Sequence, residues 1–201
     1  MSITVYVPQD AVALGLGANR VARAIFAGAE RRGLDVRIVR TGTRGMLWLE
    51  PMVEVATAEG RIAYGPVTPA DVEGLLDAGF TEGGEHALRL GDPEKMPFLA
   101  KQHRLTFHRC GVVDPVSVED YRAHGGYRGL EAALKLDAEG VVAQVRDSGL
   151  RGRGGAGFPA GIKWNTVMLA KSDQKYVVCN ADEGDSGTFA DRIMMEGDPF
   201  N

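Results

Sequence analysis

A glycine-rich stretch near residue 150 contains the residue types that point most directly to chemistry. Five glycines lie within ten residues, namely Gly152, Gly154, Gly155, Gly157 and Gly161. Glycine tolerates positive φ and close backbone approach, so such a loop can turn several N–H groups toward one point. Arg151, Arg153 and Lys163 add positive charge, and Pro159 begins a predicted helix, whose N-terminal end favours anions. The stretch predicts a site for a phosphate, or for the polar edge of a flavin or nicotinamide cofactor. A flexible loop with unrelated basic residues is the alternative.

A second group of polar residues follows a predicted buried strand, Lys175–Cys179. Ligands of open α/β sheets bind beyond the carboxyl ends of strands. Asn180 can both donate and accept hydrogen bonds, as the uracil-like edge of a flavin requires. The carboxylates of Asp182, Glu183 and Asp185 could hold ribose hydroxyls or orient a nicotinamide amide. Metal binding, acid–base hydrolysis and a capped turn before a helix at 187–195 remain open as alternatives.

The composition restricts the class of protein. The chain has 201 residues, enough for one or two domains, and 44% of them are hydrophobic. Its formal net charge of -4 argues against nucleic acid as the main partner, because phosphate binding requires a basic face. No apolar run approaches the roughly 20 residues of a membrane span, and the first residues do not resemble a secretory signal. We therefore expect a cytoplasmic protein without a membrane span.

The two cysteines, Cys110 and Cys179, form no CxxC pair and cannot provide a four-ligand metal site alone. A disulfide is not expected in a reducing compartment, so both are predicted to be buried apolar residues. A thioredoxin-type redox enzyme is disfavoured because it needs a CxxC motif. The basic residues between Arg20 and Arg44 are interpreted as solvated faces, with docking on an acidic partner as the alternative.

The first 80 residues alternate between strand and helix patterns. A loop is expected at 9–17, and a glycine ends each predicted helix. Thr68 and Pro69 give the second helix a typical start. This order predicts a small thioredoxin-like domain over 1–80. Its expected elements are a strand at 3–7, a helix at 18–32, a strand at 35–40, a hairpin of 53–55 with 61–64, and a helix ending at Gly79.

The remaining sequence predicts an ordered linker followed by a second α/β region. Glycines and prolines interrupt residues 81–104, whereas Leu88 and Phe98 favour burial there. Residues 105–201 are expected to form this second region. Its helices are predicted to start at Ser117, Tyr127, Asp137 and Pro159.

Together the two polar stretches resemble a known family. Ser148–Pro159 with Gly161, Lys163 and Trp164 is similar to the FMN/NAD site of the NADH-dehydrogenase flavoprotein (51 kDa-type) family. Asn180–Glu183, together with Gly187-Thr188 and Asp191-Arg192, resembles the second motif of that family. The run Glu183–Arg192 most resembles the beta (diaphorase) subunit of soluble, molybdenum-dependent, NAD-linked formate dehydrogenase. The resemblance covers residues 100–201 well, including 125–130, and residues 1–80 loosely. It implies that residues 105–201 are the first part of an FMN/NAD-binding domain of the α/β class.

The resemblance implies roles for the residues at matching positions. Gly152, Arg153, Gly154 and Lys163 would contact FMN, with Gly155 and Gly157 in the same cradle. Phe158 would stack near the nicotinamide. Asn180, Asp182 and Glu183 would face the isoalloxazine or ribityl part. Asp185 stands where relatives often have Glu for a nucleotide hydroxyl.

The implied function is electron transfer. Hydride passes between NAD(H) and FMN, and single electrons then pass to iron–sulfur clusters. The implied partners are a [2Fe–2S] small subunit and a molybdenum/Fe–S catalytic subunit of a formate dehydrogenase. The diaphorase subunit of a NAD-reducing hydrogenase, or of NADH:quinone oxidoreductase, is the alternative.

The sequence departs from the family in two ways. Related thioredoxin-like domains hold a [2Fe–2S] cluster through four cysteines. In this chain, Thr43 and Leu47 of the loop 42–47 stand where a cysteine pair would be, and residues 9–16 also lack cysteine. Residues 1–80 are therefore expected to be a structural or docking module. The chain also stops at Asn201, where relatives continue toward a [4Fe–4S] module. We expect residues 1–201 to be an N-terminal part that is inactive and binds FMN poorly alone.

Overall fold

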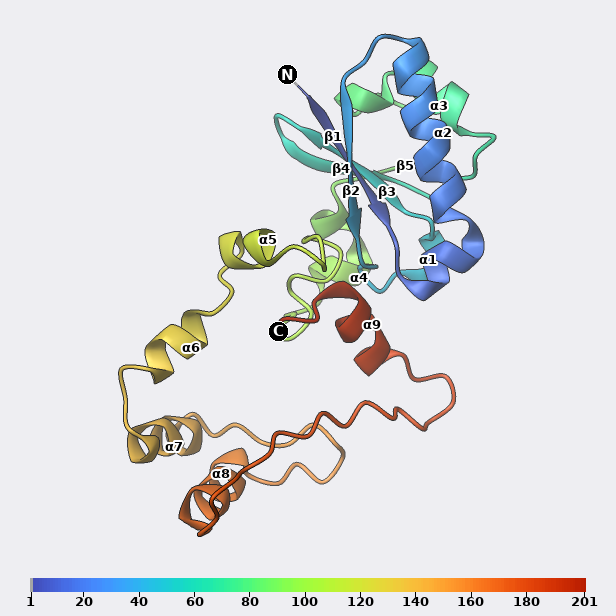
Figure 1. The fold of residues 1–201 in the computed structure, drawn as a ribbon. Helices are drawn as coiled ribbons and strands as arrows, with labels where there is room; N and C mark the ends of the chain where they lie inside the picture. Colours follow the sequence, from blue (N-terminus) through green and yellow to red (C-terminus); the bar gives the residue numbers. More distant parts are fainter. Residues whose placement is uncertain (1) are drawn as a thin grey trace. The chain divides into compact units, whose positions relative to one another are not determined.

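A computed structural model describes residues 2–201 of the chain (Figure 1). The described residues form two compact units. One comprises the chain up to His124 together with Ala181–Asn201, and the other comprises Gly125–Asn180. None of the helices in the described part of the chain has the length and apolar character that a membrane crossing requires.

The first unit is built on a five-stranded mixed sheet in the order β2-β1-β3-β4-β5. β1 and β2 are parallel, with Ile3 opposite Val36, and the other neighbouring strands are antiparallel. A parallel β-α-β unit joined at its first strand to an antiparallel hairpin is the thioredoxin-like arrangement, so the predicted fold class is confirmed. The strands are β1 (Ile3–Pro8), β2 (Val36–Thr41), β3 (Val53–Thr57), β4 (Gly60–Tyr64) and β5 (Arg89–Gly91).

Two helices cover the same face of this sheet (Figure 1). Val21 and Ile25 of α2 (Ala18–Arg31) are buried in the main core with the inward side chains of β1 and β3. α3 (Val72–Asp77) packs closely on α2, because a Cβ at Gly28 would lie 2.5 Å from a methyl carbon of Leu76. Arg32 at the end of α2 pairs with Asp77 at 2.5 Å and with Glu73 at 3.0 Å, and Arg31 also pairs with Glu73. Part of the basic cluster is thus compensated within the domain.

The structure adds a helix where the sequence predicts only a loop at 9–17. α1 (Ala11–Leu16) begins at Asp10, whose Oδ1 accepts hydrogen bonds from the N–H groups of Val12 and Ala13, both at 3.1 Å. Gly17, with φ 104°, ends it and leads into α2. The prediction was wrong because an aspartate cap can start a helix that is too short to show an apolar period.

Segment 81–104 contains further elements. β5 adds a strand to β4, and Tyr64 donates a hydrogen bond from its hydroxyl to the carbonyl of Gly84 at 2.6 Å. Leu88 packs against the main core, as its apolar character predicts. The segment also contains a 3-10 turn at Pro93–Lys95 and the short helix α4 (Pro97–Ala100). Another 3-10 turn, Phe80–Glu82, lies at its start. A third such turn, Leu47–Leu49, follows the loop after β2.

The remaining helices begin close to their predicted starts. Ser117 accepts a hydrogen bond from the N–H of Asp120 and caps α5 (Val118–Ala123). Asp137 caps α7 (Ala138–Asp147) by accepting from the N–H of Gly140 at 2.8 Å. The others are α6 (Arg128–Ala133), α8 (Ala160–Leu169) and α9 (Ala190–Gly197).

The predicted buried strand at 175–179 does not form. These residues have no strand partner among the described residues, and Tyr176 and Val178 are 81% and 83% exposed. Cys179 is also exposed, so its predicted burial is wrong, whereas Cys110 is buried as predicted. An apolar β-branched run becomes a strand only when a neighbouring strand satisfies its backbone groups.

Candidate functional site

The glycine-rich loop is closed at its base by its own backbone. Arg151 and Pro159 form an antiparallel bridge. The N–H of Gly152 donates to the carbonyl of Phe158 at 2.8 Å, and the N–H of Ala160 donates to the carbonyl of Leu150 at 2.9 Å. Residues 152–158 therefore form a defined loop that leads directly into α8. Gly155 and Gly157, at φ 102° and 58°, adopt the left-handed conformations that glycine tolerates and other residues rarely adopt.

The tip of this loop is open, and its cations have no ionic partner among the described residues. A Cβ at Gly154 or Gly155 would meet nothing within 4 Å. Arg151 donates from Nε to the carbonyl of Gly157 at 2.6 Å, and Arg153 donates to the carbonyl of Arg151 at 2.5 Å. Within residues 2–201, neither arginine takes part in an ion pair. The loop thus presents uncompensated positive charge beside free space, which suits an anionic group.

Lys163 and Phe158 flank the same loop. The ammonium of Lys163, on the first turns of α8, lies 5.6 Å from the centre of the Phe158 ring. Phe158 is 44% exposed, so one part of its ring is available for stacking. Lys163 forms no ion pair within the described chain either. The structure therefore brings the predicted residues from Gly152 to Lys163 together on one loop and one helix start.

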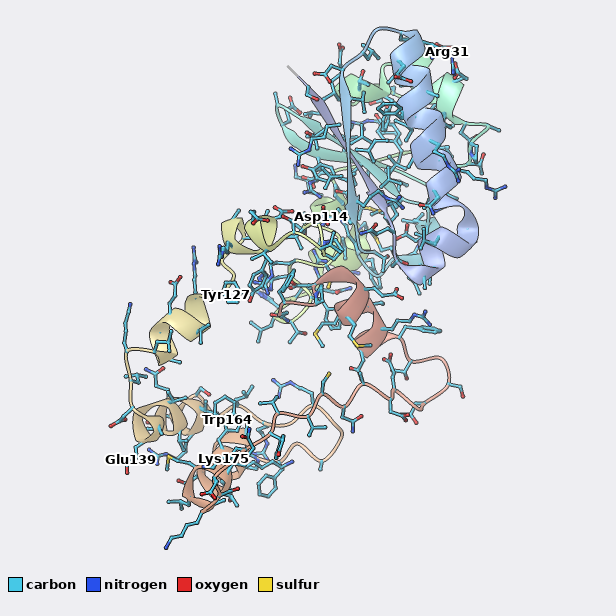
Figure 2. The ribbon with its side chains drawn as sticks, in the orientation of Figure 1. Arg31, Asp114, Tyr127, Glu139, Trp164 and Lys175 are labelled. Atoms are coloured by element: carbon cyan, nitrogen blue, oxygen red, sulfur yellow. The ribbon has the colours of Figure 1, made fainter. Side chains whose placement is uncertain are left out.

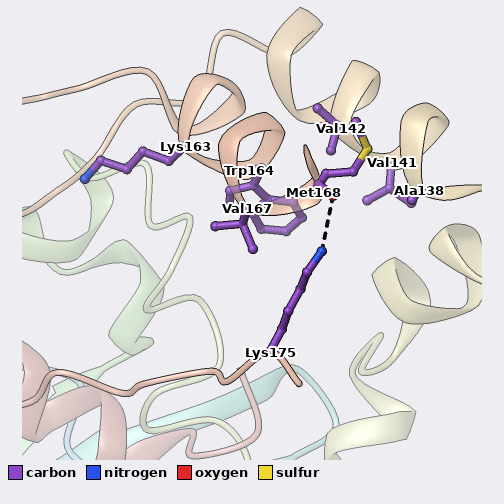
Figure 3. Close-up of a pocket in the computed structure, with 8 residues that line it drawn as sticks. All are labelled: Ala138, Val141, Val142, Lys163, Trp164, Val167, Met168 and Lys175. Carbon is purple, nitrogen blue, oxygen red and sulfur yellow. Dashed lines mark hydrogen bonds between the residues drawn. The ribbon is translucent and has the colours of Figure 1, made fainter. Parts of the chain in front are cut away.

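An apolar pocket of about 440 Å³ lies between α7 and α8 (Figure 3), and two of its residues, Trp164 and Lys175, are labelled in Figure 2. Trp164 forms part of its wall, and Lys175 donates from its ammonium to the carbonyl of Met168 at 3.2 Å. Figure 3 shows the Lys163 side chain extending away from the apolar side chains. Sequence reasoning did not identify this pocket. It is lined by Ala138, Val141, Val142, Lys163, Trp164, Val167, Met168 and Lys175.

The acidic motif has a capping residue at its centre. Glu183 has φ 45°, and its Oε1 and Oε2 accept hydrogen bonds from the N–H groups of Asp191 at 2.8 Å and Arg192 at 3.0 Å. Both carboxylate oxygens thus satisfy free donors in the first turn of α9. Sequence reasoning assigned Glu183 to the cofactor, and the structure adds this structural role.

The turn between Glu183 and α9 encloses a second hollow of about 490 Å³. Gly187 has φ 84°, and the N–H of Thr188 donates to the carbonyl of Asp185 at 3.2 Å, which closes the turn. Three of the predicted acidic residues meet here, whereas Asn180 belongs to the other compact unit. No group of three His, Cys, Asp or Glu residues suited to a metal ion occurs in the described chain. The hollow is lined by Ala181, Asp182, Glu183, Asp185, Ser186, Gly187, Thr188, Phe189, Arg192, Met195 and Glu196.

Sequence reasoning missed the residues that hold α9. Asp198 and Arg109 form a buried ion pair, and Gly197 lies against Gly42. These residues are far apart in the sequence, and neither pair lies in a recognisable motif. Nothing in the local sequence around these residues predicts that they contact one another.

Residues 145–201 match the family model of the Nuo51 FMN-binding domain. This match covers the end of α7, the glycine-rich loop and the acidic motif. The predicted resemblance to NADH-dehydrogenase flavoproteins is therefore confirmed for this part of the chain.

Individual relatives agree with this family. The chain is 56% identical over 101 residues to the NADP-reducing hydrogenase subunit HndC of Solidesulfovibrio fructosivorans, covering 50% of this chain and 20% of that protein. It is 53% identical over 89 residues to an NADH-quinone oxidoreductase subunit of Rhizobium meliloti, covering 44% and 21%. The chain thus spans about a fifth of the length of these relatives. A thioredoxin-like [2Fe-2S] ferredoxin from Aquifex aeolicus is 22% identical, with a TM-score of 0.38, covering 45% of this chain and 97% of that structure.

Proposed function

We propose that residues 151–164 and 180–192 bind FMN and NAD(H), and that the full-length protein is an NAD(H):FMN oxidoreductase (diaphorase) subunit. The observation that carries this proposal is the glycine loop. Its backbone is closed at the base, its tip is open at Gly154 and Gly155, and its cations lack ionic partners within the described chain. This donor set fits the phosphate and polar edge of FMN, and it lies in the segment that matches an FMN-binding domain.

The residues of this chain would bind and orient the two cofactors. A bound flavin supplies the ability to take up hydride and to release electrons singly. Arg153, Lys163 and the loop N–H groups would hold the anionic part of FMN. Asn180, Asp182 and Asp185 would hydrogen-bond the ring edge and the ribose or ribityl hydroxyls. No acid or base is needed for the hydride itself, so the chain contributes geometry and electrostatics.

Loss of FMN from two loop variants tests the site. Gly154→Leu fills the open tip, and Arg153→Met removes a cation while keeping a long side chain. Each is expected to raise the Kd of FMN about ten-fold or more in the full-length protein, measured by flavin fluorescence. Arg153→Met loses a charge-assisted contact, worth about 1.5–3 kcal/mol, and Gly154→Leu places a side chain in the space that the cofactor would occupy. Arg146→Met on α7, an exposed arginine outside the loop, is the matched control. Unchanged FMN affinity in both loop variants would disprove the assignment.

Within this class we favour a cytoplasmic NAD-linked formate dehydrogenase, with a [2Fe–2S] small subunit and a molybdenum/Fe–S subunit as partners. The run Glu183–Arg192 supports this choice. The relatives named as hydrogenase and NADH-quinone oxidoreductase subunits support the alternative substrates hydrogen and quinone. NAD-dependent activity of the purified complex, assayed separately with formate, hydrogen and quinone, separates the three. Activity with hydrogen or quinone but not with formate would contradict our choice.

A second candidate function concerns residues 1–80 as a docking module. Trp48, next to the loop that lacks cysteines, is 61% exposed and packs edge-on against Phe98 with ring centres 5.0 Å apart. Exposed aromatic side chains are typical of protein interfaces. Trp48→Ala is expected to weaken assembly of the complex, measured by co-purification of its subunits. Phe26→Ala, at a 48% exposed position on α2, is the control. Full assembly of the Trp48 variant would exclude this surface.

A further inference from the structure

Helix α9 connects the acidic motif to the thioredoxin-like domain. At its N-terminal end, Glu183 accepts hydrogen bonds from the N–H groups of Asp191 and Arg192. With 8 residues, the helix is about 12 Å long and behaves as a short rigid rod. A displacement at its far end is therefore transmitted to the first turn, where Glu183 is attached.

The C-terminal end of α9 is held by three independent contacts. Glu196 accepts the N–H of Ala11, at the start of α1, at 2.8 Å. Gly197 lies so close to Gly42, just after β2, that a Cβ at Gly42 would be 2.5 Å from the Cα of Gly197. The third contact is the buried pair of Asp198 with Arg109, at 2.8 Å. Each contact reaches a different segment of the domain, so a shift of α9 in any direction disturbs at least one of them.

Two of these contacts reach loops that follow strands of the sheet. Gly42 lies just after β2, and Ala11 begins α1 shortly after β1. The C-terminal end of α9 therefore packs against the loops that follow the two parallel strands.

We propose that the thioredoxin-like domain positions the cofactor-binding acidic motif, with Gly42 and Arg109 as positioning residues that act through α9 and Glu183. The proposal rests on the proposed function, because it assumes that residues 180–192 bind part of FMN or NAD(H). Neither Gly42 nor Arg109 lines the hollow beside the motif. Their influence on binding must therefore pass through the helix.

The test is Gly42→Ala in the full-length protein. The added methyl group meets backbone rather than a flexible side chain, so α9 must shift. We expect the Kd of FMN or the KM for NADH to rise about ten-fold, as typical for coupling between sites, with faster amide exchange at Asp191 and Arg192. Gly15→Ala in α1 is the matched control, because a Cβ there meets nothing within 4 Å. Unchanged affinity and unchanged exchange in Gly42→Ala would overturn the proposal.

A measurement on the unaltered protein covers the case in which Gly42→Ala fails to fold. Coupling is reciprocal, so FMN or NADH must slow amide exchange at the remote end of α9, both at Asp198 and at Ala11, whose N–H donates to Glu196. No slowing there would contradict the proposal. The loop variants Gly154→Leu and Arg153→Met separate the two ideas. If both keep their FMN affinity, the proposed site is wrong. If they lose affinity while Gly42→Ala and the remote amides remain unaffected, only the positioning role is wrong.

Discussion

Arg109 donates from Nε to Oδ2 of Asp198 at 2.8 Å, and both side chains are buried, with 7% and 1% of their surface exposed. The guanidinium also donates to Asn201 at 2.9 Å and lies 4.6 Å from the centre of the Tyr121 ring. Oδ1 of Asp198 has no hydrogen-bond partner among the described residues. The pair thus joins the end of α9 to the segment before α5, and it depends on both charges being present.

Removing one member of this pair is expected to be costly. Arg109→Met leaves the Asp198 carboxylate buried without its cation, which typically lowers the free energy of unfolding by about 3–5 kcal/mol. Urea denaturation at pH 7, followed by circular dichroism, measures the effect. The exposed pair of Arg146 with Asp147 provides the control, because Arg146→Met should change stability little. A loss in Arg109→Met no larger than in the control would contradict the prediction.

Glu50 predicts a pH dependence of stability. Its side chain lies in the interior, with the residue 4% exposed, and Oε2 accepts the N–H of Met52 at 2.8 Å. Burial raises the pKa of Glu50 to about 7, although hydrogen bonds from Thr43 and Met52 act in the opposite direction. Burial likewise raises the pKa of Asp10. Both carboxyls therefore hold their protons more tightly in the folded chain than in the unfolded chain.

The sign of the effect follows from this difference. The folded-state pKa of Glu50 lies above its ordinary value of 4.5. Its contribution to the free energy of unfolding is therefore fully present below pH 4.5 and is lost as the pH rises through about 7. The glutamine in Glu50→Gln cannot ionise, so this variant does not lose that stability. The variant should therefore gain up to about 3 kcal/mol over the unaltered chain between pH 5 and pH 8, measured by urea denaturation. Exposed Glu59→Gln is the control. Parallel stability profiles for the Glu50 variant and the unaltered chain would contradict the prediction.

Local chemistry made much of the fold predictable. Ser117 and Asp137 start helices because their side chains satisfy free N–H groups of the first turn, and this signal lies within four residues. The apolar period of α2 likewise identifies Val21 and Ile25 as core residues. The glycine loop was recognisable because Gly155 and Gly157 permit conformations that other residues rarely adopt.

The parts that could not be predicted depend on partners far away in the sequence. β5 is only three residues long and exists because β4 is beside it. The run 175–179 has strand composition, yet no strand pairs with it among the described residues. In the candidate site, Glu183 was expected to face a cofactor, and its bonds to Asp191 and Arg192 could not be foreseen without the position of α9.

Gly161 and Gly154 are expected to respond differently to the same substitution. A Cβ at Gly161 would lie 2.5 Å from the Cα of Arg146, whereas one at Gly154 meets nothing. The methyl group added in Gly161→Ala must move α8 away from α7, which should lower the free energy of unfolding by about 1–3 kcal/mol. Gly154→Ala should leave stability within about 0.5 kcal/mol. Amide exchange across α7 and α8 reports the difference. Equal protection in the two variants would show that α7 and α8 are not packed through Gly161.

The two cysteines should differ strongly in reactivity. Burial and the nearby Asp198 carboxylate raise the pKa of the Cys110 thiol to about 11, so little thiolate exists at pH 8. Cys179 is exposed.

Iodoacetamide at pH 8 is expected to alkylate Cys179 of the folded 201-residue chain and to leave Cys110 unmodified, as read by peptide mass spectrometry. Denaturant should make both react, which serves as the internal control. Protection of Cys179 under native conditions would mean that residues 175–179 are covered, as a buried strand requires, and would restore the expectation drawn from the sequence.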